Sequence, residues 1–254
     1  MTFRKYSLCS MFFLVVRAFS QNETAAFRPN EYRSIENSAF SVGEDLVYEV
    51  RFGRVSAGEA RMHIPQLVSY QSRDCYHLIS EIKTSPFFSK FFHVEDRVES
   101  YLDVLGLFPW RYEKRIHEGK YRANRSARFD PVGGWAYSGG DTIKIAPYTQ
   151  DVLSILYYLR TLDLQPQTVF AIDNYEDKKY YPLNVQVKKM EGVKVPAGKF
   201  YCFLIEPGLR AGSIIEQKGK MWIWLSHDAR RIPVKIKSKI SFGAITMELK
   251  KINH

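Results

Sequence analysis

The sequence predicts a mainly β protein, in which a strongly curved antiparallel sheet or half-barrel wraps around one central α-helix. Most of the chain consists of short segments in which apolar and polar residues alternate, the period of a half-buried strand. Aromatic residues, which favour strands, make up 15% of the 254 residues. Only residues 148–162 have the spacing of a long helix. A single apolar helix between two runs of strands requires a concave sheet to cover it.

The first twenty residues have the pattern of an export signal. Arg4 and Lys5 precede an apolar core at residues 11–16, and a small-x-small pattern places cleavage between Ser20 and Gln21. We therefore expect an exported protein, periplasmic or secreted. No later apolar run approaches the roughly 20 residues that a membrane-spanning helix needs.

Residues 21–40 are polar and lack periodicity, so they are expected to form an N-terminal arm or linker before a single β-rich domain at 41–254. Removing residues 1–20 lowers the formal net charge from +10 to about +7, since three basic residues and no acidic ones are lost. The remaining positive charge suits binding to acidic lipid headgroups; the alternative is that the basic residues cover the solvated face of strands. No nucleic-acid partner is expected. Cys75 and Cys202 lie in apolar segments, and either a disulfide or two buried thiols fits the sequence.

Twelve strands are predicted, separated by turns. Residues 85–92, with four phenylalanines, are expected to form a short helix or a lip at the rim of the sheet, and the Gly-rich residues 130–140 a loop. The predicted strands are 44–52, 59–67, 74–84, 94–103, 110–118, 121–129, 168–175, 178–190, 199–207, 219–226, 231–238 and 244–252.

The helix at about 148–162 is predicted from apolar residues that recur three and four positions apart. Thr149 and Asp151 at its start can cap free N–H groups, and Arg160 suits its last turn. A weak internal repeat, which we call the internal echo, flanks this helix. A strand, a turn that contains Asp, and a basic strand that begins near a proline occur around Asp103 and again around Asp228. The echo suggests two similar meanders.

No catalytic set is apparent. None of the six histidines lies in a metal-binding motif, and no serine lies in a GxSxG motif. His93, near Glu95 and Asp96, is interpreted as a rim histidine beside solvated acids. Arg97 and Glu99 are expected to form cross-strand ion pairs. We therefore expect no enzyme activity, no cofactor and no metal.

A binding role is predicted because the sequence has more large aromatic side chains, in residues 87–92 and at the tryptophans, than are needed to fill a core. The phenylalanine-rich segment is expected to form the lip of an apolar cavity, with arginines as headgroup partners. The alternative is that the helix fills the concavity and these aromatic residues are core. The candidate residues are Phe87, Phe88, Phe91, Phe92, Arg97, Trp110, Arg111, Tyr158, Arg160, Trp222 and Trp224.

Several motifs together resemble a bacterial family of exported proteins, the domain of unknown function 3108. The most specific are the helix motif at 151–160 and the VPAGKF turn at 195–200. The others are the motifs at 43–48, 57–58, 96–101, 109, 222–225 and 231–233. The resemblance spans about residues 40–252. It implies a secreted or periplasmic β-rich protein without assigned chemistry, similar in shape to lipoprotein carriers that hold acyl chains in a curved sheet.

The sequence therefore predicts an uncharacterised, non-catalytic protein of the cell envelope that binds a hydrophobic or lipid-like molecule in its curved sheet. The alternative is a structural or adaptor protein that binds another envelope protein through exposed sheet edges. An open aromatic cavity would favour the first function, and an unpaired apolar edge beside a filled cavity would favour the second.

Overall fold

The computed structural model describes residues 32–208, 220–240 and 243–253. The predicted signal, its cleavage site and the first part of the predicted arm lie outside these residues. Within the unit Tyr32–His254, the described residues form one sheet of sixteen strands and two helices, so the prediction of a mainly β protein is confirmed. In the same part of the chain, no helix has the length and apolarity that crossing a membrane requires.

The strands are mostly four to twelve residues long and follow the alternation of the sequence. The helices are α1 (Pro86–Ser89) and α2 (Ser154–Arg160). The strands are β1 (Asp45–Phe52), β2 (Val55–His63), β3 (Leu67–Tyr70), β4 (Arg73–Thr84), β5 (Glu95–Asp103), β6 (Pro109–Glu118), β7 (Tyr121–Asp130), β8 (Trp135–Ser138), β9 (Asp141–Lys144), β10 (Gln150–Asp151), β11 (Val169–Glu176), β12 (Lys179–Val195), β13 (Gly198–Pro207), β14 (Lys220–Ser226), β15 (Pro233–Ile240) and β16 (Gly243–Asn253).

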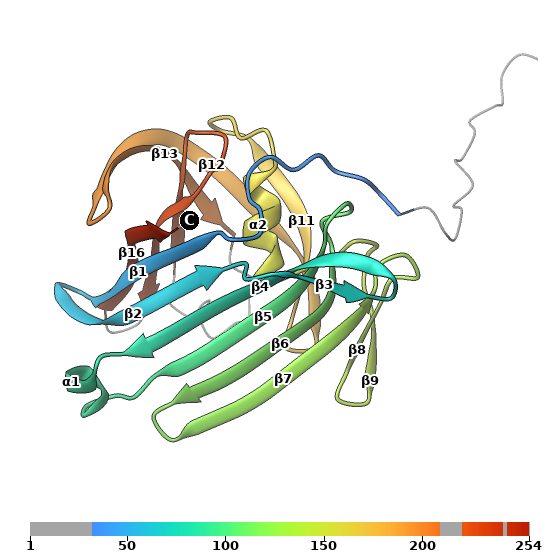
Figure 1. Ribbon diagram of the computed structural model, residues 1–254, viewed down its shortest axis with the longest axis horizontal. Helices are drawn as coiled ribbons and strands as arrows, with labels where there is room; N and C mark the ends of the chain where they lie inside the picture. Colours follow the sequence, from blue (N-terminus) through green and yellow to red (C-terminus); the bar gives the residue numbers. More distant parts are fainter. Residues whose placement is uncertain (1–31, 209–219, 241–242, 254) are drawn as a thin grey trace, which may run out of the picture. The chain divides into compact units, whose positions relative to one another are not determined.

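The sheet is a long antiparallel meander whose strand order begins in the middle of the chain. The order runs from β10 through β16, continues with β1, β2 and β4, and ends at β9, with β3 paired to β4 beside this path. β1 and β16 therefore lie side by side, with Asp45 opposite Asn253. β10 is the exception to the antiparallel pattern, because it pairs in parallel with β11. Figure 1 shows the strands curving around α2.

The two ends of this strand order approach each other without a hydrogen-bonded ladder between β9 and β10 in the described part of the chain. Lys178, before β12, forms an ion pair of 2.7 Å with Asp141 of β9. The rings of Phe129 and Tyr175 meet edge to face at 5.3 Å and join β7 to β11. The sheet is thus strongly curved but unclosed.

α2 contributes to the main hydrophobic core, together with side chains from strands on both sides of the sheet order. Its buried residues include Ile155, Tyr157 and Leu159. The aromatic ring of Phe40, from the segment before β1, packs edge to face on Tyr157 at 5.0 Å. The described part of the predicted arm therefore lies on the core next to α2.

The predicted helix was too long, and a second helix is present. Residues 150–151 form β10 instead of a helical turn, and Tyr148 has a left-handed backbone with φ of 60°. The carboxylate of Asp151 accepts hydrogen bonds from the N–H groups of Leu153 and Ser154, both 2.8 Å. Asp151 thus stabilises the turn before a helix that begins at Ser154, six residues after the predicted start.

Two other predictions were wrong at short elements. The Gly-rich residues 130–140, predicted as a loop, contain β8, and neither β9 directly after them nor β3 was predicted. These strands have four residues each, too few for alternation to be read with certainty. The prediction of a short helix at the rim is confirmed by α1, whose N-cap Ser85 accepts a hydrogen bond from the Phe88 N–H at 3.2 Å.

The internal echo corresponds to two equivalent turns. Asp103 accepts hydrogen bonds from the backbone N–H groups two and three positions later, at 3.1 and 2.7 Å. Asp228 does the same at 3.1 and 3.2 Å. In both turns the residue two positions before the strand proline has a left-handed backbone: Leu107 with φ of 48° and Arg231 with φ of 44°. Each aspartate therefore organises a tight turn into the next strand.

Cys75 and Cys202 are buried free thiols, so no disulfide joins them in this structure. Cys202 belongs to the main core, whereas Cys75 packs in a separate cluster with Phe108 and Trp110. Burial raises the pKa of each thiol to about 12.

Candidate functional site

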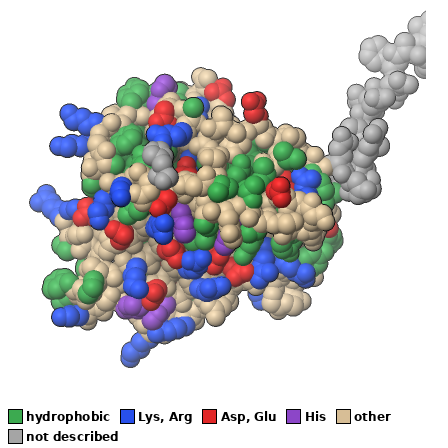
Figure 2. Space-filling model, viewed as in Figure 1, with side chains coloured by type: hydrophobic (Ala, Val, Ile, Leu, Met, Phe, Trp, Pro, Cys, Tyr) green, Lys and Arg blue, Asp and Glu red, His purple; other side chains and the backbone are tan. Residues whose placement is uncertain are grey.

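The phenylalanines predicted to line a cavity lie at the tip of the molecule around α1. The exposed fractions of Phe87, Phe91 and Phe92 are 64%, 75% and 50%. Phe88 is half-buried, with its ring 6.5 Å from that of Phe52. Figure 2 shows the apolar side chains gathered over α1 with basic side chains beside them. The α1 tip thus presents an apolar surface to solvent.

The three arginines predicted as headgroup partners are paired with acidic side chains. Arg160 is buried and binds Glu44 with both ends of its guanidinium, at 2.7 and 2.6 Å. Arg97 binds Glu81 of the neighbouring strand β4, an ion pair across strands as expected, and Glu99 within its own strand. Arg111 lies 2.6 Å from a carboxylate oxygen of Glu113.

The tryptophans are also separate from one another. Trp110 is buried, and its indole N–H donates to Asp103 at 3.1 Å. Trp222 and Trp224 alternate with the buried Ile223 and therefore share the opposite face of β14. Lys235 lies over the ring of Trp224 at 5.8 Å. The structure therefore does not bring the predicted residues together into one site.

A cavity of about 310 Å³ lies instead along the outer edge of β11, and we call it the edge cavity. Tyr158 of α2 lines it and is the one predicted site residue found there. The other lining residues are Arg33, Pro147, Tyr148, Gln150, Leu162, Val169, Phe170, Ala171, Ile172 and Asp173.

The edge of β11 is unpaired along this cavity. On one side β11 pairs with β12 over its whole length, but on the other side β10 pairs only with Asn174 and Tyr175. Residues 169–173 therefore have no strand partner on that side among the described residues. The segment before β10 bonds elsewhere: Pro147 has no N–H to donate, and the N–H of Tyr148 donates to the carbonyl of Pro131 at 2.9 Å.

Both polar and apolar groups line the edge cavity. The side-chain N–H₂ of Gln150 donates to the carbonyls of Leu107 and Tyr148, at 2.9 and 3.2 Å. Its oxygen is buried and has no hydrogen-bond partner among the described residues. The guanidinium of Arg33 stacks 4.6 Å from the ring of Tyr148 and 5.1 Å from that of Tyr158. Burial lowers the pKa of Arg33, while the neighbouring tyrosines and Asp103 oppose that effect.

Sequence reasoning missed this cavity because its parts are far apart in the chain. Arg33 lies in the segment predicted as an arm, and Gln150 lies in the segment predicted as helix. One signal was available: Pro147, directly before the expected helix, prevents that segment from extending a strand beside β11.

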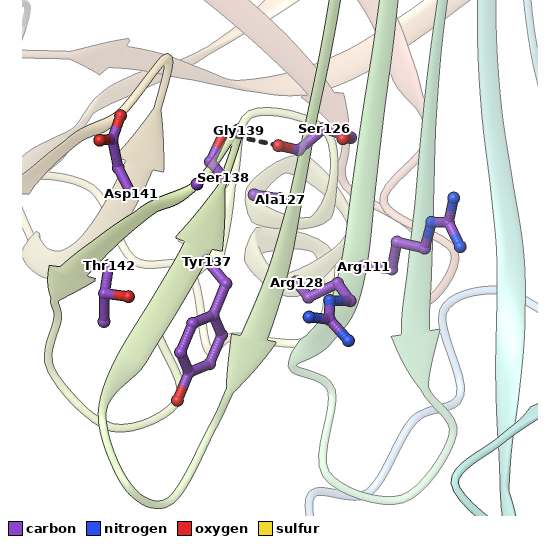
Figure 3. A pocket seen from close by; sticks show the side chains of 10 residues that line it. Arg111, Ser126, Ala127, Arg128, Tyr137, Ser138, Gly139, Asp141 and Thr142 are labelled. Carbon is purple, nitrogen blue, oxygen red and sulfur yellow. Dashed lines mark hydrogen bonds between the residues drawn. The ribbon is translucent and has the colours of Figure 1, made fainter.

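A second cavity, of about 410 Å³, lies on the sheet surface at β6–β9. Arg111, Arg128, Tyr137 and Thr142 are cross-strand neighbours on successive strands, and Figure 3 shows them in one row. The hydroxyl of Ser138 donates to the backbone carbonyl of Ser126 at 2.6 Å. Arg111, which lines this cavity, is already paired with Glu113.

One group of side chains with metal-ligating chemistry is present in the described part of the chain. It consists of His93, Glu95 and His117, whose ligand atoms all lie within 4.8 Å of one another. These residues lie near the α1 tip, at the ends of β5 and β6.

Comparison with solved structures supports the fold. The chain is similar to a β-barrel-like protein of the domain of unknown function DUF1849 from Brucella abortus, with a TM-score of 0.59 and 11% identity over 85% of this chain and 99% of that chain. At this identity the likeness shows the fold alone.

Two further structures match less well. One is described as an exported protein with a YmcC-like fold from Bacteroides fragilis, with 13% identity over 88% of this chain and all of that one. The other is described as a lipoprotein from Parabacteroides distasonis, with 11% identity over the same shares. Both have a TM-score of 0.32, which supports no inference about this chain.

No curated protein matches the sequence. The model of the family described as protein of unknown function (DUF3108) matches residues 47–250. This match covers most of the chain and includes the helix motif and the VPAGKF turn, so the chain belongs to the DUF3108 family.

Proposed function

We propose that this chain is a non-catalytic binding module that captures an extended segment of a partner protein as an added strand on the β11 edge. One observation carries the proposal: residues 169–173 of β11 have no strand partner on one side among the described residues, and this free edge opens onto the edge cavity. Free backbone N–H and C=O groups beside a side-chain pocket are what strand addition requires.

The length of the free edge suits a short segment. Five residues of strand extend about 17 Å at roughly 3.3 Å per residue. β10 already occupies the same line further along β11, so an added strand would continue it. Main-chain hydrogen bonds would supply sequence-independent affinity, and the cavity would select side chains at alternate positions.

The lining of the cavity indicates which segment fits. Tyr158, Leu162 and Phe170 offer apolar contact, so an apolar side chain is expected at the position that enters the cavity. Arg33 favours an acidic residue or a carboxylate nearby.

The compartment belongs to the same proposal. The basic residues, apolar core and cleavage pattern of residues 1–20 support export to the periplasm with cleavage after Ser20. The partner would then be another protein of the cell envelope.

A second candidate is the binding of a hydrophobic or lipid-like molecule in the same cavity. Its volume of about 310 Å³ is at the lower end of the range of roughly 300–1,000 Å³ for small-molecule sites, and Tyr158, Leu162 and Phe170 supply apolar contact. Native mass spectrometry after incubation with envelope lipids tests this candidate. A retained mass of lipid size that is lost on solvent extraction would support it.

Selection of binders from a library of random linear peptides tests the strand-addition proposal. The enriched sequences should alternate apolar and polar residues, and on binding they should slow hydrogen exchange at the amides of 169–173. Ala171→Trp, which fills the edge cavity, should abolish binding. Ala229→Trp is the matched control, because Ala229 is also exposed and lies in the turn before β15. Equal binding to both variants, or no enriched sequence, would refute strand addition at β11.

A further inference from the structure

Three side chains with metal-ligating chemistry converge at the base of the α1 tip. His93 follows the phenylalanine segment, Glu95 begins β5, and His117 lies near the end of β6. The imidazole nitrogens and carboxylate oxygens all lie within 4.8 Å of one another. The two histidine rings meet at a centroid distance of 4.3 Å, and Glu95 lies 3.7 Å from the His93 Nε2.

The strand register places these side chains together. Arg97 of β5 is opposite Arg115 of β6, and the bridge between Val94 and Glu118 continues this register. Glu95 is therefore opposite His117, and both project from the same face of the sheet. The β5–β6 pairing and the bridge between Val94 and Glu118 hold the backbone on both sides of Glu95 and His117.

Two hydrogen bonds fix the backbone positions of the histidines. The N–H of Gly119 donates to the carbonyl of His93 at 2.7 Å. The N–H of His117 donates to the carboxylate of Asp96 at 2.9 Å. The donor atoms can therefore approach one another by side-chain rotation alone. Metal–nitrogen bonds of about 2.0–2.1 Å place tetrahedral ligand atoms roughly 3.4 Å apart, about 1.4 Å closer than the 4.8 Å within which these atoms lie.

A neighbouring charged side chain orients the carboxylate of Glu95. Lys83 donates to one oxygen of Glu95 at 3.1 Å, and the other oxygen is the one nearest His93. An ionised carboxylate and a neutral imidazole are the forms that bind metal.

We propose that His93, Glu95 and His117 form a binding site for a divalent transition-metal cation of the Zn²⁺ type. Two imidazole nitrogens and one carboxylate oxygen are a ligand set for such metals, and three protein ligands leave a coordination position for water or another molecule. Lys83 then acts as the outer partner that orients the carboxylate. This site is separate from the edge cavity.

Metal binding at this site would tie the α1 tip to the turn between β6 and β7. Phe92 directly precedes His93, and its ring lies against Gly119, where an added Cβ would be 3.2 Å from the ring. Figure 2 shows histidine and acidic side chains beside the apolar group over α1. An ion held by His93 and His117 would cross-link the two segments and hold the exposed phenylalanines in one position.

Isothermal titration of the tag-free chain with Zn²⁺ at neutral pH tests the proposal. One ion should bind per chain. His117→Ala, His93→Ala and Glu95→Gln should each weaken binding by at least about 100-fold, since loss of an outer partner alone costs 10–100-fold. His227→Ala is the matched control, because His227 is exposed and lies outside the cluster. It should bind as the parent chain does.

Two further measurements distinguish the site from general surface binding. Co²⁺ should give a visible absorption spectrum in the parent chain and in His227→Ala, but not in His117→Ala. Zn²⁺ should raise the thermal midpoint of the parent chain and leave that of His117→Ala unchanged, because only a ligand bound to the native state stabilises it. No binding by the parent chain at millimolar Zn²⁺, or equal binding by His117→Ala and His227→Ala, would overturn the proposal.

Discussion

Arg160 and Glu44 lie 116 positions apart in the sequence and form a bidentate ion pair, with Arg160 buried. The same guanidinium also donates to the carbonyls of Ala39 and Arg230, at 3.0 and 3.1 Å. Arg160 therefore joins the end of α2 to the segments before β1 and before β15. The positive charge of Arg160 is neutralised by Glu44 inside the protein, which explains why Arg160 does not face a ligand.

Removing one member of this pair should strongly destabilise the fold. Arg160→Met or Glu44→Gln leaves a buried charge or its partner groups uncompensated, and each should cost about 3–5 kcal/mol of unfolding free energy. Urea unfolding followed by circular dichroism measures this. The double variant should cost less than the sum of the two single ones. Strict additivity would show that the two side chains act independently.

Asp103 should make the protein sensitive to acid. Burial alone would raise the pKa of its carboxyl group, but hydrogen bonds from Arg73, the Gly106 N–H and Trp110 hold it below the usual value. A carboxyl with a lowered native pKa stabilises the fold above its unfolded pKa of about 3.9, and this contribution is lost as the pH falls through the native pKa.

Asp103→Asn should therefore lower the unfolding free energy by about 2–3 kcal/mol near neutral pH and flatten its decline below about pH 4. The measurement is the urea midpoint at a series of pH values. Asp228→Asn is the control, because Asp228 makes the equivalent turn at a more exposed position. If the two variants have the same acid profile, the Arg73 pair is not the source of the sensitivity.

The α1 tip should tolerate polar substitution without loss of stability. Phe91 is 75% exposed, so Phe91→Ser should change the unfolding free energy by no more than about 0.5 kcal/mol. Phe40, which packs on Tyr157 in the core, provides the contrast: Phe40→Ala should cost about 3–5 kcal/mol. Thermal midpoints of both variants check this. A large loss with Phe91→Ser would mean that the tip is covered in the folded protein.

Cys75 and Cys202 should be unreactive in the native state. Both thiols are buried and their pKa values are raised to about 12, so little thiolate exists at neutral or mildly alkaline pH. A thiol reagent such as DTNB should modify neither residue until urea is added, and both afterwards. Rapid modification of the native protein, or a mass two daltons low that reduction restores, would contradict this assignment.

The elements that could be predicted from sequence are the long ones. Strands such as β4 and β6 alternate over ten or more residues, and the family motifs span the same region. The family prediction at residues 40–252 is confirmed by the match over 47–250. The two Asp turns were also visible, since Asp followed by a strand proline is a local signal.

What failed were features set by contacts between distant residues. Arg160 looked like a surface cation in a last helical turn, because nothing local reveals that Glu44 approaches it. The start of α2 was wrong because Asp151 stabilises the turn before the helix from within a short strand that only β11 makes possible. The edge cavity combines Arg33, Gln150 and β11, and no period in the sequence relates these segments.

The pairing of β1 with β16 has a consequence for biosynthesis. Asp45 and Asn253 are cross-strand partners 208 positions apart, and this ladder is the seam that joins the meander of β1–β9 to that of β10–β16. A growing chain cannot form the seam until β16 has been made. Until then β1 has an unpaired side, so the native sheet is completed only after synthesis has passed Asn253. An early truncation within β16 would leave two half-sheets with open edges, ready to associate with each other between molecules.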